Sequence, residues 1–326
     1  MNKIFLPSVA YRKYSTPLLY GAEVVIKNYV GMNIFPKYIY GEWQHGAIYN
    51  LPGIYPEHIN EGNSENKNNP TWTFNCLQES LLLQSNYKAK AIGAPILYLP
   101  ELQIPYKRIS GTLLIFPAHS SLNIHAYNSS NESVKKYLSY IKKIKKHFDY
   151  VAVCLHSECI RRNLWVNEFK DLSIEIIQGA DVRDTNSLER MRALMSQFEF
   201  VTSNQIGSHI AYASFFGSKV SLAGPLHNFE LDAILLEPFY KKNSHLASWI
   251  VDQNKLAMQK FAFLHTNPWE AMSNKKWAGE QLGVKNILKP EEMKRLFKLN
   301  DMSQLFLQAK HALKRKLLYA KGLLDD

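Results

Sequence analysis

The second half of the chain alternates between apolar runs and helical segments, and this alternation constrains the fold more than any other feature. Four short runs have the composition of buried strands: 149–156, 172–181, 199–204 and 218–225. Segments typical of helices lie between them, and the connections are short. Strands joined in this way form βαβ units, so the pattern predicts a parallel sheet with helices on both faces.

The helix expected over 186–198 shows the periodicity most clearly. Leu188, Met191, Leu194, Met195 and Phe198 fall on one helical face. Asn186 with Glu189 three residues later resembles a capping box at its start. These positions predict one apolar face that packs against the sheet.

The first half of the chain alternates less regularly, although it also contains candidate strands. One aromatic run ends in the turn 41–46, and a longer apolar run, 111–118, stops at His119. With 326 residues and 46% hydrophobic composition, the chain is long enough for two domains. We expect an N-terminal α/β domain over 1–130, a nucleotide-binding domain over 131–267 and a helical tail over 268–326.

Cysteine usage and hydropathy bear on the compartment. Cys76, Cys154 and Cys159 are odd in number and form no CxxC pair, which favours a reducing cytosol over a disulfide scaffold or a zinc site. The N-terminal sequence lacks an apolar core followed by small residues, so no signal peptide is expected. No run approaches the roughly 20 apolar residues of a membrane span. We expect a cytoplasmic protein.

Polar and small residues gather where the predicted strands of the second half end. In parallel α/β sheets, ligands bind beyond the carboxyl ends of the strands. The opening of the helix after 199–204 adds backbone N–H groups and a positive dipole end, which can hold an anion. The residues that we expect to contact a nucleotide donor are His156, Ser157, Gly179, Ser203, Asn204, Gly207 and Ser208. Plain helix capping and packing would produce the same residues.

Several stretches together resemble a known enzyme class. The pieces "GEWQHG" (41–46), "AIGAPILYL" (91–99), "LLIFPAHSS" (113–121) and "FVTSNQIGSHIAYASFFGSKVSLAGP" (200–225) are similar to bacterial GT-B glycosyltransferases of capsule and lipopolysaccharide assembly. The resemblance implies two Rossmann-like domains that face each other across a cleft, with a helical C-terminal tail that packs back on the first domain. It also implies a nucleotide-sugar donor and a glycan or lipid-linked glycan acceptor.

Within this class, transferases that use CMP-activated acid sugars carry an acidic motif beside a glycine, a histidine–proline pair and a serine-rich stretch. Glu42, beside Gly41, resembles the acidic motif. The chain departs from the pattern because it has no consecutive acidic pair and because serine, not proline, follows His119. Because His119, the neighbouring serines and the net positive charge all suit an anionic donor, a CMP-activated acid sugar such as Kdo or a nonulosonic acid is the first expected donor. A UDP-sugar is the second.

Glycosyl transfer needs a group that takes the acceptor proton and groups that stabilise the departing phosphate. Glu42 is the expected catalytic carboxylate, and His45 would orient it or contact phosphate. His119, with Ser120 and Ser121, would hold the phosphate. Each also has a simpler interpretation, as a surface glutamate, a turn or a cap. Asp181, Arg183 and Asp184 match no divalent-cation motif, so neither a metal nor a cofactor is expected.

The formal net charge of +11 favours an anionic partner. Lysines concentrate on a predicted helix at 134–148, opposite its apolar stripe. This pattern fits a solvated helix face, or peripheral contact with an anionic inner membrane where a lipid-linked acceptor would lie. Nucleic-acid binding is not expected, because no RNA-binding or helix-turn-helix signature accompanies the basic runs.

The sequence thus predicts a metal-independent glycosyltransferase that acts on a bacterial surface glycan. Two alternatives stay open. One is a nucleotide-sugar epimerase or hydrolase on the same fold, and the other is a non-enzymatic basic module that binds polyanions.

Overall fold

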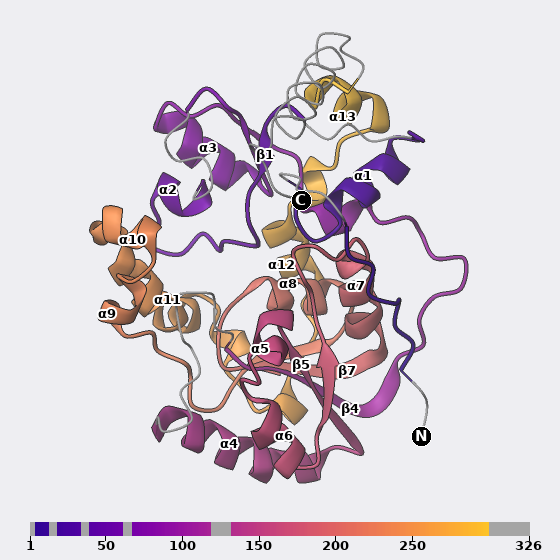
Figure 1. Cartoon of the computed structure of the whole chain (residues 1–326), viewed down its shortest axis with the longest axis vertical. Coiled ribbons are helices and arrows are strands. Elements are labelled where there is room, and N and C mark those ends of the chain that lie inside the picture. The colour runs from indigo at the N-terminus through magenta and orange to yellow at the C-terminus, as the bar shows by residue number, and fades with distance from the viewer. Residues whose placement is uncertain (1–3, 13–17, 34–38, 61–66, 119–131, 300–326) are drawn as a thin grey trace, which may run out of the picture.

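The computed structural model describes residues 4–12, 18–33, 39–60, 67–118 and 132–299. Two parallel sheets form the framework of this part of the chain (Figure 1). The larger has five strands and the smaller three. The prediction of an α/β fold with parallel strands is therefore confirmed.

The five-stranded sheet has the strand order β6-β5-β4-β7-β8, and every neighbouring pair is parallel. Its strands are β4 (Ile109–Phe116), β5 (Tyr150–Leu155), β6 (Glu175–Gln178), β7 (Phe198–Ser203) and β8 (Lys219–Leu222). The helices between them are α4 (Glu132–Ile144), α5 (Ser157–Arg161), α6 (Val166–Asp171), α7 (Ser187–Gln197) and α8 (Ser208–Phe215). Along the chain, β4 forms the centre of the sheet, β5 and β6 follow on one side of it, and β7 and β8 then lie on the other side. The strand order therefore reverses between β4 and β7.

Both faces of this sheet are buried, as the apolar sequence of β4 requires. Leu113 and Ile115 face one side, where they pack in a cluster with residues of α4 and α6. Leu114 and Phe116 face the other side, in a larger cluster with residues of α7 and α8. Alternate residues of a strand point to opposite faces, so a run that is apolar at every position fits only a strand covered on both sides.

The smaller sheet, β1-β2-β3, belongs to the first half of the chain. It consists of β1 (Glu42–Trp43), β2 (Thr71–Thr73) and β3 (Ala89–Ala91). The helices of this half are α1 (Ala22–Tyr29), α2 (Pro56–Ile59) and α3 (Cys76–Gln84). At the start of α3, Asn75 and Gln78 form a reciprocal capping box. Three strands of two or three residues make a smaller sheet than the Rossmann-like domain expected over 1–130.

The strand β4 pairs across the boundary that we expected between the first and second domains. We expected this apolar run within the first domain, but it pairs with β5 and β7 at the centre of the five-stranded sheet. The physical reason is its continuous apolar character, which suits a central strand better than any position in the short sheet. The change of sheet along the chain therefore lies between β3 and β4, before residue 109.

The described elements after β8 are helices. They are α9 (Leu231–Ile234), α10 (Pro238–Lys242), α11 (Ala247–Lys260), α12 (Lys275–Leu282) and α13 (Pro290–Leu296). The described part of the expected tail contacts both halves. Helix α12 packs against α8, while the carbonyl of Leu282 accepts a hydrogen bond from the N–H of Ala94, and the ring of Phe297 meets Trp43 edge to face. One apolar cluster consequently runs from the first half through α7 and α8 to the tail.

Within the described ranges, no helix combines the length and the apolar character needed to cross a bilayer.

Candidate functional site

A cavity of about 350 Å³ lies at the carboxyl edge of the five-stranded sheet. Residues just beyond the ends of four strands line it. They are Phe116 and Pro117 of β4, Cys154 and His156 of β5, Gly179 and Ala180 after β6, and the segment 205–209 after β7. The cavity thus spans the point where the strand order reverses, which is where open parallel α/β sheets bind their ligands.

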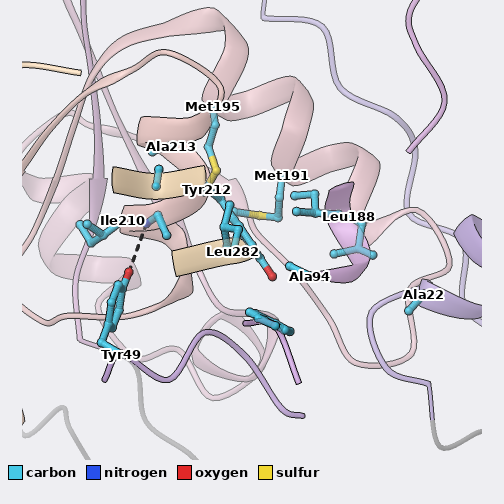
Figure 2. Packing of buried hydrophobic residues seen from close by; sticks show 14 of the residues in the cluster. Ala22, Tyr49, Ala94, Leu188, Met191, Met195, Ile210, Tyr212, Ala213 and Leu282 are labelled. Carbon is cyan, nitrogen blue, oxygen red and sulfur yellow. Dashed lines mark hydrogen bonds between the residues drawn. The ribbon is translucent and has the colours of Figure 1, made fainter. Parts of the chain in front are cut away.

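The first half of the chain supplies the opposite wall. Two segments, 18–20 with Ala22 and 43–47, contribute most of it, with Phe74 and Pro95 beside them. The lining is largely apolar. Figure 2 shows Leu188 and Met191 of α7 close to Tyr212 of α8, and all three line the cavity. Among the described residues the lining includes His45, His156 and His209, but no lysine, arginine or carboxylate.

His45 interacts with Tyr20 at the wall of the cavity. The Tyr20 Oη and His45 Nε2 atoms lie 3.2 Å apart, within hydrogen-bond distance, and the two rings meet edge to face. Although His45 is open to solvent on one side, burial of its ring lowers its pKa, and the neighbouring His156 lowers it further. Burial raises the pKa of Tyr20 to about 12, with a smaller contribution from Asp181. At neutral pH, both side chains are uncharged.

The loop before α1 fixes the position of Tyr20. Tyr20 adopts a left-handed backbone conformation with φ of 60°, and its N–H donates to the carbonyl of Val182 over 3.2 Å. At the next residue, Gly21 has φ of 78°, and an added Cβ would lie 2.1 Å from the carbonyl oxygen of Thr185. Only glycine fits so close to another backbone. The sequence Tyr20-Gly21 therefore docks this loop on the turn after β6.

A buried ion pair holds the same loop. Arg12 Nη1 lies 2.9 Å from Glu23 Oε1, and both side chains are almost fully buried. Arg12 also donates to the carbonyls of Leu18 and Val182, at 2.7 and 2.6 Å. These contacts of Arg12 link the N-terminal segment, α1 and the turn after β6. Removal of either member of the ion pair would leave an unpaired buried charge, which destabilises the fold.

His156 lies at the end of β5 and caps α5. Its Nδ1 accepts a hydrogen bond from the N–H of Glu158 over 3.2 Å. In the neutral ring, the other nitrogen, Nε2, therefore carries the proton and is a donor. Burial lowers the pKa of His156, while Asp181 and Glu158 oppose that effect. A neutral histidine with a fixed tautomer lines the cavity here.

The start of α8 is bound to the opposite wall. The Oγ of Ser208 accepts a hydrogen bond from the N–H of Ala47 over 2.7 Å, and Tyr49 Oη donates to the carbonyl of Gly207 over 2.9 Å. A Cβ on Gly46 would lie only 3.0 Å from Ser208 Oγ. The turn 44–46 and the helix start therefore form one continuous rim.

Gln205 gives the cavity a polar group whose hydrogen-bonding capacity is not fully used. It lies just before the start of α8 and lines the cavity. Its side-chain oxygen is buried and has no hydrogen-bond partner within the described part of the chain. Buried amide oxygens are normally paired, so this atom is suited to a ligand donor.

The structure brings together only part of the predicted site. His45, His156, Gly179, Gly207 and Ser208 all line the cavity. Three predicted residues, His119, Ser120 and Ser121, lie outside the described residues.

Glu42, the predicted catalytic carboxylate, is not part of the cavity lining. It precedes Trp43 in β1, and the two side chains point to opposite faces of the strand, so Trp43 lines the cavity instead. Glu42 is half-buried, accepts a hydrogen bond from Asn69 over 3.3 Å, and has a pKa raised by burial. The cavity gives no support to its predicted role.

Three further predicted residues have structural partners outside the lining. Ser203 Oγ donates to the carbonyl of Phe116 over 2.7 Å, and Asn204 Oδ1 accepts from the N–H of Ala118 over 2.8 Å. Both side chains link β7 to the end of β4. The Ser157 side chain is hydrogen-bonded to Asp181. These residues shape the carboxyl edge of the sheet, and they do so from behind the cavity.

Sequence reasoning missed Tyr20 and Gln205 as site residues. Gly21 was the available signal for Tyr20, because glycine is the usual residue where the backbone is left-handed or approaches another segment closely. Gln205 directly follows the predicted strand end at 204, so its position could have identified it. His209 also lines the cavity, and its ring stacks on Phe116 with the ring centres 4.7 Å apart.

The described residues contain no group of three histidine, cysteine or acidic side chains arranged to hold a metal ion. No protein-family model matches the chain, and no curated protein is significantly similar to it. The chemistry of this cavity, at the reversal point of a parallel sheet, is therefore the main guide to function.

Proposed function

We propose that the protein is a glycosyltransferase that binds a nucleotide-activated sugar in the cavity at the carboxyl edge of the five-stranded sheet. The observation that carries this proposal is the position of the cavity across the reversal of strand order between β4 and β7. Two neutral histidines, a buried amide oxygen and a helix start face a space large enough for a nucleoside or a sugar.

The donor phosphate would be held at the polar side of this cavity. His156 offers an Nε2–H donor, because its Nδ1 already accepts from Glu158. The start of α8, at Gly207 and Ser208, adds the positive end of a helix dipole. Bonding to phosphate favours the protonated imidazole, so His156 would gain charge when the ligand binds. The added proton would sit on Nδ1, which would then release the N–H of Glu158.

His45 would take the acceptor proton. In the tautomer with the proton on Nε2, His45 donates to Tyr20 Oη, and Nδ1 can then accept a proton. The acceptor hydroxyl oxygen would form a bond to the anomeric carbon, and the bond from that carbon to the donor phosphate oxygen would break. The phosphate would leave with the bonding electron pair, and the hydroxyl proton would pass to His45.

The cavity bears on the choice of donor. We expected a CMP-activated acid sugar largely because of His119 and its neighbouring serines, which lie outside the described residues. Within the described lining no lysine or arginine is present that would distinguish a carboxylate on the sugar from a second phosphate group. We therefore propose a CMP-activated acid sugar and a UDP-sugar as the two donors to test. The proposed acceptor, a bacterial surface glycan, rests on the family resemblance.

A nucleotide screen tests the proposal directly. Thermal shift with CMP, CDP, UMP, UDP and GDP identifies a ligand that stabilises the folded protein, and calorimetry gives its affinity. His156→Gln should weaken the best nucleotide about tenfold, as expected for loss of one bond to a charged group. His147→Gln is the matched control, because His147 stacks on Trp269 outside the cavity.

Product analysis then identifies the reaction. With the preferred nucleotide sugar, transfer requires an added glycan acceptor. Consumption of the donor at the same rate without an acceptor would instead indicate the epimerase or hydrolase alternative. If no nucleotide stabilises the protein, or if His156→Gln binds as tightly as the wild type, the proposal fails.

A further inference from the structure

A second concavity, of about 470 Å³, lies on the other side of the sheet, between α4 and the turn after β8. Its lining consists of Glu132, Lys135, Lys136, Ser139, Tyr140 and Lys143 of α4, with Pro225 opposite. We refer to these seven residues as the lysine groove. None of them lines the cavity described above.

The amphipathic pattern of α4 turns these lysines away from the core. Val134, Tyr137, Ile141 and Ile144 are buried against the sheet in one apolar cluster. Residues between those positions must then lie on the outer face of the helix, which runs along the lower edge of the molecule in Figure 1. This accounts for a row of exposed lysines, but not for their position around a concavity.

Tyr140 and the turn after β8 create the concave shape. The Tyr140 ring packs directly over Gly224, where an added Cβ would lie 2.5 Å from the ring. Gly224 also has φ of 80°, so the turn that presents Pro225 depends on glycine for two reasons. The ring and the proline form two sides of the groove, and the lysines stand around them.

The charges in the groove are unbalanced. Three lysines face one acid, Glu132, whose carboxylate lies 3.9 Å from Lys136 with both side chains mostly exposed. Such a pair contributes little, so the groove keeps its positive character. Like charges gathered around one concavity repel each other, and a bound anion relieves that repulsion.

We infer that the lysine groove binds a phosphate-bearing anion. Lysine ammonium groups are compact charges that bind phosphate well, and Ser139 adds a hydroxyl donor to the same wall. A free diphosphate and the headgroup of a phospholipid both present this phosphate chemistry, and the test below distinguishes the two sources. The inference does not depend on the proposed transferase activity, since it involves no residue of the cavity.

Equal-charge variants of one helix provide the test. Lys135→Gln with Lys143→Gln removes two groove lysines, whereas Lys142→Gln with Lys146→Gln removes two exposed lysines of the same segment that do not line the groove. Binding of inorganic diphosphate is measured by calorimetry, and binding to phosphatidylcholine vesicles that contain phosphatidic acid by cosedimentation. Circular dichroism and thermal melting confirm that both variants fold.

The groove variant should lose about tenfold in affinity for at least one of the two probes, while the control variant changes less than about twofold. Loss with diphosphate identifies a free phosphate ligand, and loss with vesicles alone identifies a lipid headgroup. An equal loss in both variants would show a general effect of charge and would overturn the inference. So would binding that neither variant alters, or no binding of either probe to the wild type.

Discussion

The Tyr20 hydroxyl and the His45 Nε2 atom lie 3.2 Å apart, although 25 residues separate them along the chain. The contact joins the loop before α1 to the turn after β1. The same turn is bound to the start of α8, where Ser208 Oγ accepts a hydrogen bond from the N–H of Ala47. Because Gly21 locks Tyr20 against Thr185, the tyrosine is a fixed partner for the imidazole. His45 thus has one ring nitrogen with a defined neighbour, as an acid–base group requires.

Tyr20→Phe should slow the proposed transfer about tenfold and leave the KM of the donor nearly unchanged. When the phenol oxygen accepts from Nε2–H of His45, Nδ1 is the unprotonated nitrogen that faces the acceptor. Without the phenol oxygen the ring populates both tautomers, and Nδ1 is available as the base for only part of the time. Nitrogen-15 spectra of His45 should show this change of tautomer directly. Tyr150→Phe is the control, because it removes a tyrosine hydroxyl that bonds Glu175 outside the cavity. Equal activity of Tyr20→Phe and the wild type would remove Tyr20 from the mechanism.

Nucleotide affinity should rise as the pH falls below neutrality. Burial lowers the pKa values of His45 and His156 below their ordinary value of 6.5, so both are neutral in the free protein at pH 7. A phosphate bound at His156 favours the protonated form of that ring and raises its pKa, so binding takes up a proton, while His45 stays neutral as the base. Calorimetry in buffers of different ionisation enthalpy measures this uptake. His156→Gln should take up fewer protons than the wild type, and an identical uptake would contradict the assignment of His156.

The fold of the second half could be predicted because its signals are local. Each apolar run is a strand, and Gly179, Gly207 and Ser208 follow strands β6 and β7 directly, so knowing the strand ends was enough to place them at the cavity. His156 followed from the same reasoning. In a parallel sheet the carboxyl ends of all strands lie at the same edge, so residues that follow different strands come together there.

The first half was harder because its contacts are not local. The short sheet of this half is made of strands with two or three residues, too few for a period-2 pattern to show which side of β1 faces the ligand. A shift of one residue in the inward-facing positions of β1 decides whether the side chain of Glu42 or that of Trp43 lines the cavity, and in the structure it is Trp43. Tyr20 reaches the site only through a loop docked on the turn after β6, a pairing over more than 160 residues that no local pattern encodes.

Gly283→Ala should destabilise the protein far more than Gly31→Ala. Both glycines have positive φ, 74° and 68°, so both alanines carry the same backbone strain of about 1–2 kcal/mol. At Gly31 an added Cβ meets nothing within 4 Å. At Gly283 it would lie 1.6 Å from the carbonyl oxygen of Phe74, so the tail would have to move away from the first half.

Urea unfolding measures this difference in the free energy of unfolding. We expect the loss at Gly283 to be at least about twice that at Gly31, because backbone atoms cannot shift as a flexible side chain does. Similar losses for the two variants would show that the backbone around Gly283 and Phe74 moves apart easily enough to admit a Cβ.

The free energy of unfolding should fall as the pH drops from 6.5 toward 4, and His227 should account for part of the loss. Burial lowers the pKa of His227 from 6.5 to about 4, and its Nε2 has no hydrogen-bond partner among the described residues. Between these two values the unfolded chain binds a proton that the folded protein does not bind. Stability therefore rises with pH in this window and is lost as the pH falls through it.

A pKa difference of this size corresponds to at most about 3 kcal/mol for the single group. His227→Gln removes the titrating ring, so its unfolding free energy should change less between pH 6.5 and pH 4 than that of the wild type. His245→Gln serves as the control, because His245 is an exposed histidine on the segment before α11. Parallel pH profiles for the wild type and His227→Gln would show that His227 binds its proton equally well in the folded and unfolded protein. Its burial would then not contribute to the loss of unfolding free energy at low pH.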